Sequence, residues 1–112
     1  MPSSEEPSLA GVLTSEQVAN TASAIAAVQE PSGAIPWFTG GHTDVWDLVE
    51  SAMALTAAGR YIEADRAYRW MVKTQRQDGS WPIRIDPWSV TRPWSMRIGQ
   101  DPTWRWVFTI QR

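Results

Sequence analysis

The chain has 112 residues, of which 43% are hydrophobic, enough for one small domain with a core. Ten Lys and Arg residues against 12 Asp and Glu give a formal net charge of −2, a balance that predicts no nucleic-acid partner. The absence of cysteine excludes disulfides and thiolate metal sites.

Residues 1–13 are rich in Ser, Pro and Glu, and this composition predicts a mobile N-terminal tail. The tail has no basic residues and no long apolar run, so it is not expected to be a secretory signal. No stretch of the chain approaches the roughly 20 apolar residues of a membrane span. We therefore expect a cytoplasmic protein.

A first helix is predicted over residues 14–29. Thr14 and Gln17 fit a capping box at its start, and Pro31 requires the helix to end before it. The spacing of one set of side chains indicates a buried stripe, which consists of Val18, Thr21, Ala22, Ile25 and Val28.

Two further helices are predicted over residues 44–58 and 61–76. Thr43 is expected to cap the second helix, with Asp44 and Asp47 in its first turn, where the helix dipole favours negative charge. The short turn at Gly59 makes these helices an antiparallel hairpin. The predicted buried faces consist of Val45, Leu48, Val49, Ala52 and Leu55 on the second helix, and of Ala64, Ala67, Tyr68 and Met71, with Trp70 beside them, on the third.

A short pattern closes both the first and the third helix. Gln29 and Gln75 are each followed four residues later by a glycine, and the two copies are 46 residues apart. Trp81 follows in the second copy, where the first has Ile35, and a proline comes next in both. This spacing is typical of an architecture built from repeated helix pairs.

The second copy, QRQDGSW, resembles the QxxxGxW motif of the terpenoid cyclase and protein prenyltransferase superfamily. Residues 14–82 as a whole resemble bacterial prenyltransferase-like proteins with repeats of this type. The resemblance implies an all-α fold: an α/α hairpin array forming part of an α/α toroid, with an irregular or short-strand C-terminal tail. It also implies an isoprenoid substrate and a transferase or cyclase activity. Three helices cannot close a ring, so the expectation is a truncated member with little activity of its own.

The motif itself is predicted to be structural. The resemblance implies that the glutamine ties a helix end to its neighbour and that the tryptophan stacks on the adjacent repeat. The chemistry agrees, because an amide can satisfy backbone groups left open at helix ends, and an indole supplies a large buried contact.

The best candidate site is the stretch GGHTDVWDLVE, a glycine-led loop that enters the second helix. The carboxylates are spaced along one helix face and suit protonation of an olefin, magnesium binding, or acid and base roles on a glycoside. The alternative is that they only favour the helix N-terminus. The predicted catalytic residues are His42, Asp44, Asp47 and Glu50, and the predicted substrate-binding residues are Trp46 and Trp37.

Several activities of the resembling family are not supported by motifs in this chain. Asp44-Val-Trp-Asp47 does not match DxDD, and DDxxD is absent. With no cysteine and one histidine, the zinc site of the prenyltransferases cannot be built, and neither a metal nor a cofactor is assigned. Two alternatives remain. One is part of a carbohydrate-active (α/α)6 barrel using Asp44 and Glu50. The other is a non-catalytic scaffold that binds a protein partner, or forms a homo-oligomer, through open hairpin ends.

Residues 83–112 form a tail rich in Trp and Arg whose structure stays open. The stretch TWRWVFTI alternates as a strand does, with Trp104, Trp106, Phe108 and Ile110 on one side. Three explanations compete: a strand or irregular segment packed on the helices, a frameshifted or truncated reading frame, and weak contact with a membrane surface.

Overall fold

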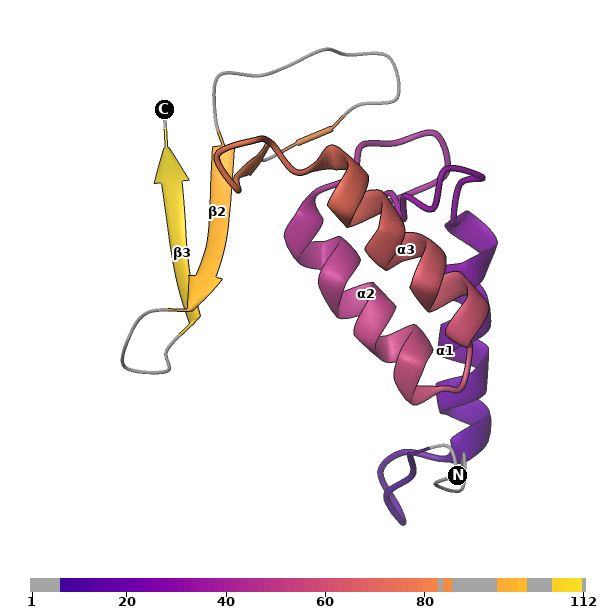
Figure 1. The fold of residues 1–112 in the computed structure, drawn as a ribbon. Coiled ribbons are helices and arrows are strands. Elements are labelled where there is room, and N and C mark those ends of the chain that lie inside the picture. Colours follow the sequence, from indigo (N-terminus) through magenta and orange to yellow (C-terminus); the bar gives the residue numbers. More distant parts are fainter. Residues whose placement is uncertain (1–6, 83, 86–94, 101–105, 112) are drawn as a thin grey trace.

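The computed structural model describes residues 7–82, 84–85, 95–100 and 106–111. The helices are α1 (Ser15–Val28), α2 (Val45–Ala57) and α3 (Tyr61–Thr74), and the strands are β1 (Trp81–Pro82), β2 (Ser95–Gln100) and β3 (Trp106–Gln111). The helices lie together as a bundle, and β2 and β3 stand outside it (Figure 1). The predicted all-α hairpin array with a short-strand tail is therefore confirmed.

Helix α1 begins at the predicted capping box. The Gln17 backbone N–H donates to Thr14 Oγ1 at 3.1 Å, and the Thr14 backbone N–H donates to Gln17 Oε1 at 2.9 Å. Ala22 is buried, while Ile25 and Val28 are half-buried against the core. The predicted stripe thus faces the hairpin, although Thr21 on its edge is exposed.

Helix α2 starts one residue later than predicted, because Asp44 and not Thr43 is its N-cap. Thr43 instead forms a two-way backbone bridge with Ile85, with both N–H to O distances at 2.8 Å. The carbonyl of an N-cap residue accepts the first hydrogen bond of the helix. The Thr43 carbonyl accepts the Ile85 N–H instead, whereas the Asp44 carbonyl accepts the Leu48 N–H at 3.1 Å. The bridge also ties the start of α2 to the segment that follows β1.

The core lies between α2 and α3. The turn that joins these two helices contains Gly59, whose φ of +77° lies in the region that favours glycine. The predicted face of α2 is confirmed, because Val45, Leu48, Ala52 and Leu55 are fully buried. On α3 the prediction for Tyr68 is wrong: this ring is 38% exposed, since no element packs over that side of the helix among the described residues.

The two Gln-x-x-x-Gly turns have the same backbone design. Gln29 and Gln75 are the C-caps of α1 and α3, each with φ −62° and ψ 131°. Each side-chain amide donates to the glycine carbonyl four residues on, at 3.1 Å for Gly33 and 3.0 Å for Gly79. Trp81 is buried, and its indole N–H donates to the Met71 carbonyl at 2.9 Å. The ring therefore packs back onto α3, the helix that precedes it.

The strands form an antiparallel sheet in the order β1-β2-β3. Trp81 pairs with Met96, and the β2–β3 register runs from Ser95 opposite Gln111 to Gln100 opposite Trp106. The strand predicted in the stretch TWRWVFTI is confirmed over residues 106–110, which belong to β3. The tail's Trp88, Trp94 and Trp104 lie outside the described residues. None of the helices described is long and apolar enough to cross a membrane.

Candidate functional site

The loop that precedes α2 doubles back and gathers three rings. The Trp37 backbone N–H donates to the His42 carbonyl at 2.9 Å, and the Gly41 N–H donates to the Phe38 carbonyl at 2.8 Å. The Trp37 and His42 ring centroids are 4.6 Å apart with planes tilted by 46°, and Phe38 meets His42 edge-on at 6.3 Å. Trp37 and Phe38 are each 60% exposed, so the loop presents aromatic surface to solvent.

Asp44 uses both carboxylate oxygens to fix this loop to α2. Oδ1 accepts the Asp47 backbone N–H at 2.8 Å, which is the N-cap bond of the helix. Oδ2 accepts the Trp37 indole N–H at 2.7 Å. Asp44 therefore sets the direction of the Trp37 ring relative to the first turn of α2, which is a positioning role.

Asp47 has the perturbed carboxyl of the site. Partial burial raises its pKa, and a hydrogen bond with the Asp44 side chain raises it further. The negative charges of Asp44 and Glu50 act in the same direction, while the Trp37 indole N–H opposes the rise. A carboxyl that holds its proton more tightly than usual is suited to work as a general acid.

A cleft of about 420 Å³ opens beside these groups, between α1, α2 and the loop. This volume lies within the usual range of small-molecule sites. Its wall is largely apolar, and Asp47 is the one carboxylate among its described lining residues. The lining consists of Thr21, Ala24, Ile25, Val28, Ile35, Pro36, Trp37, Asp47 and Ser51.

Two of the six predicted site residues, Trp37 and Asp47, line the cleft. His42 and Asp44 contact Trp37 but do not line the cleft. Glu50 is exposed and influences Asp47 through its charge. Trp46 is 38% exposed and also lies outside the cleft lining. Their catalytic and binding roles stay predictions. Across the described ranges, no three His, Asp or Glu side chains gather closely enough to hold a metal ion.

Sequence reasoning missed Phe38 and the apolar wall of the cleft. Phe38 directly follows Trp37 in a loop that contains two adjacent glycines. Two neighbouring aromatic residues in such a loop were the signal that the sequence offered. Ile25 and Val28 had been placed in the buried stripe of the first helix. They are half-buried and line the cleft, because the loop at Ile35 covers only part of α1.

Asp44→Ala should destabilise the chain by about 1–2 kcal/mol, because it removes the N-cap bond of α2 and the anchor of Trp37. Asp44→Asn should recover most of the capping contribution, since asparagine caps as well as aspartate. Urea unfolding of the three proteins measures the difference. Equal stability of the alanine and asparagine variants would show that the N-cap bond contributes little.

No protein-family model matches the chain. The chain is similar to a protein of Mycolicibacterium hassiacum named MMP endo-(1,4)-3-O-methyl-alpha-D-mannosidase, with 63% identity over 79 residues. The matched region is 70% of this chain but 22% of the relative, so the chain spans about a fifth of that protein's length. Any stretch of 79 residues in a chain of 112 includes residues 34 to 79, so the match contains Trp37, Asp44 and Asp47.

This similarity overturns the family suggested by the sequence pattern. The relative is named as a mannosidase, which is a glycoside hydrolase, so the prenyltransferase-like and terpenoid-cyclase-like interpretation, with its transferase activity, is wrong. The physical reason is that the Gln-x-x-x-Gly-x-Trp motif forms a helix-end turn. A turn of this kind reports on how helices are joined and carries no chemistry. The similarity supports the carbohydrate-active alternative better.

Proposed function

We propose that the chain carries part of the substrate site of a glycoside hydrolase acting on (1,4)-linked 3-O-methyl-α-D-mannosides. The observation that carries this proposal is the juxtaposition at the cleft: an exposed Trp37 ring, held by Asp44, beside Asp47 with its raised pKa. The substrate class comes from the name of the M. hassiacum relative, whose matched region includes these residues.

The lining of the cleft suits a methylated sugar. A 3-O-methyl group and the C–H face of the ring are apolar, and the Trp37 ring with Ile25 and Val28 offers an apolar wall for them. Ser51 and Asp47 supply hydrogen-bonding groups for the remaining hydroxyls. An unmethylated mannoside would leave part of this wall without an apolar partner, so the methylated sugar should bind more tightly.

In this proposal Asp47 protonates the oxygen of the leaving sugar. Glycoside hydrolysis also needs a second carboxylate on the other side of the scissile bond. Asp44 is hydrogen-bonded to Asp47, and Glu50 lies one turn along the same helix, so neither stands across the cleft from Asp47. The second carboxylate must therefore approach from another element than α2, and the described residues bind and orient the sugar without completing the reaction.

Binding of a short (1,4)-linked oligosaccharide of 3-O-methyl-α-D-mannose to the chain tests this proposal. The indole N–H signal of Trp37 in an NMR titration should shift with the methylated sugar, and less with an unmethylated one. Trp37→Ala should weaken binding about tenfold, the loss of one good stacking contact.

Tyr61→Ala is the control, because this aromatic residue is 60% exposed at the start of α3 and lies outside the cleft lining. It should leave the affinity unchanged. If the methylated sugar does not bind, or if Trp37→Ala and Tyr61→Ala weaken binding equally, the cleft is not the sugar site.

A further inference from the structure

Phe38, in the loop that precedes α2, has no part in the proposed function so far. Its ring is 60% exposed and does not line the cleft. A single exposed apolar side chain is common on protein surfaces and by itself indicates nothing. What distinguishes this ring is that the loop fixes its position.

Gly41 and His42 hold the Phe38 ring in place. The Gly41 N–H donates to the Phe38 carbonyl at 2.8 Å, which closes a turn and brings residue 41 against the ring. A Cβ added at Gly41 would lie 2.8 Å from Phe38 Cε2 and 2.9 Å from Cζ, so only glycine leaves room for the ring here. His42 meets the ring edge-on, with centroids 6.3 Å apart. A ring that is already fixed loses little conformational freedom when a ligand packs on it.

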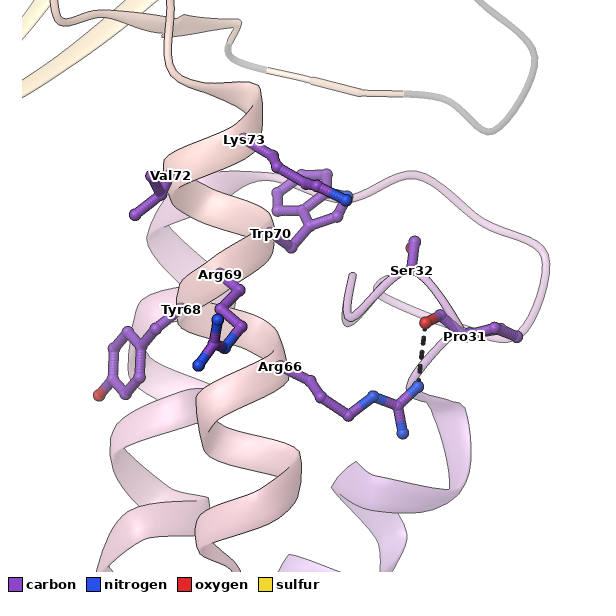
Figure 2. Close-up of a pocket in the computed structure, with 8 residues that line it drawn as sticks. All are labelled: Pro31, Ser32, Arg66, Tyr68, Arg69, Trp70, Val72 and Lys73. Carbon is purple, nitrogen blue, oxygen red and sulfur yellow. Dashed lines mark hydrogen bonds between the residues drawn. The ribbon is translucent and has the colours of Figure 1, made fainter.

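The aromatic residues of α3 are arranged differently. A groove of about 590 Å³ follows this helix, and Tyr68 and Trp70, which both line it, project from different sides of α3 (Figure 2). Trp70 is 7% exposed because it packs into the core, whereas Tyr68 is 38% exposed. These two rings therefore do not form a continuous surface, as the rings of the loop do.

The rings of the loop extend the wall of the cleft. Trp37 lines the cleft, and the His42 ring lies beside it with centroids 4.6 Å apart. Phe38 lies on His42, so aromatic surface continues from the cleft beyond its edge. The His42 ring is half-buried, and its nitrogens have no hydrogen-bond partner among the described residues. An apolar ring face beside free hydrogen-bonding nitrogens suits a sugar, which has an apolar C–H face and a rim of hydroxyl groups.

We infer that Phe38 and His42 form a second sugar subsite, which binds the unit next in the chain to the sugar in the cleft. The C–H face of that unit packs on the Phe38 ring, and the His42 imidazole bonds one of its hydroxyls. Continuity with the cleft identifies the occupant, because a (1,4)-linked chain that rests on Trp37 and leaves the cleft at that end passes His42 and Phe38. This inference rests on the proposed function and adds a preference for longer sugar chains.

Calorimetry on the full chain tests the subsite with two (1,4)-linked oligosaccharides of 3-O-methyl-α-D-mannose, a disaccharide and a tetrasaccharide. Phe38→Ala should weaken binding of the tetrasaccharide about three- to tenfold more than binding of the disaccharide, the contribution of one stacking contact. Trp37→Ala should weaken both sugars equally. Tyr61→Ala is the matched control, since it removes a ring that is also 60% exposed, at the opposite end of the α2–α3 hairpin, and it should affect neither sugar.

Gly41→Ala displaces the Phe38 ring without removing it. The φ of Gly41 lies outside the positive region, so the backbone accepts alanine and the new methyl group meets the ring. Gly41→Ala should therefore weaken binding of the tetrasaccharide as Phe38→Ala does. In a chain that already has Phe38→Ala it should cause no further loss, because the ring on which it acts is gone.

The outcomes separate this inference from the proposed function. If both sugars bind and Trp37→Ala weakens them, but Phe38→Ala affects the two sugars equally or not at all, the second subsite is wrong and the cleft stands. Additive losses from Gly41→Ala and Phe38→Ala would also overturn the subsite, because the glycine would then act other than through the ring. If neither sugar binds, the proposed function fails and the subsite fails with it.

Discussion

Asp47→Asn should lower mannoside hydrolysis by about 10²- to 10⁴-fold, the usual contribution of a positioned general acid. The assay needs a complete enzyme, so the matched region of the M. hassiacum mannosidase is exchanged for the corresponding residues of this chain, with and without the substitution. Asparagine fills the same space but cannot deliver a proton to the leaving sugar. Release of reducing ends from a methylmannose oligosaccharide measures the rate.

The pH dependence of the chimeric enzyme distinguishes the role of Asp47 from that of Glu50. A general acid works only while protonated, so the rate should fall as the pH rises through the raised pKa of Asp47. The charge of Glu50 helps to raise that pKa. Glu50→Gln should therefore move the fall to lower pH and leave the plateau rate nearly unchanged.

Two outcomes would contradict this assignment. A chimeric enzyme that keeps its rate with Asp47→Asn would show that Asp47 is not the acid. A plateau rate that is lost with Glu50→Gln but kept with Asp47→Asn would transfer the chemical role to Glu50. A parallel sugar-binding measurement on each variant shows whether a lost rate reflects chemistry or binding.

The helices could be predicted from the sequence because each is specified by residues close together in the chain. The capping box of Thr14 and Gln17, the turn at Gly59 and the buried face of α2 are local patterns, and all are confirmed. The choice of Asp44 over Thr43 as a cap was not local. It depends on the bridge from Thr43 to Ile85, 42 residues away, which no helix pattern encodes.

The family could not be predicted from the Gln75-to-Trp81 motif, because the motif's contacts are all structural. Gln75 caps α3 and the Trp81 indole donates to a carbonyl of the same helix, so neither group reaches the cleft. The titratable residues of the sequence indicated the candidate site, but only the structure shows that Asp44 and Asp47 have different roles. Adjacent carboxylates in a sequence look alike until their hydrogen bonds are known.

Gly33→Ala and Gly79→Ala should differ in stability although the two glycines hold equivalent places in the repeat. Both have positive φ, +100° and +86°, so both substitutions incur the penalty of about 1–2 kcal/mol for a side chain in this region. Only at Gly33 would the new methyl group overlap the Arg66 backbone carbonyl, which should add about 1–3 kcal/mol. We therefore expect Gly33→Ala to cost about twice as much as Gly79→Ala, or to prevent folding.

Urea unfolding followed by circular dichroism measures both variants against the parent chain. The comparison isolates the contact of the first turn with α3, because Gly79 lies in the same kind of turn and, among the described residues, has no helix packed against it. Equal losses would contradict the expected overlap between the new methyl group at position 33 and the Arg66 carbonyl.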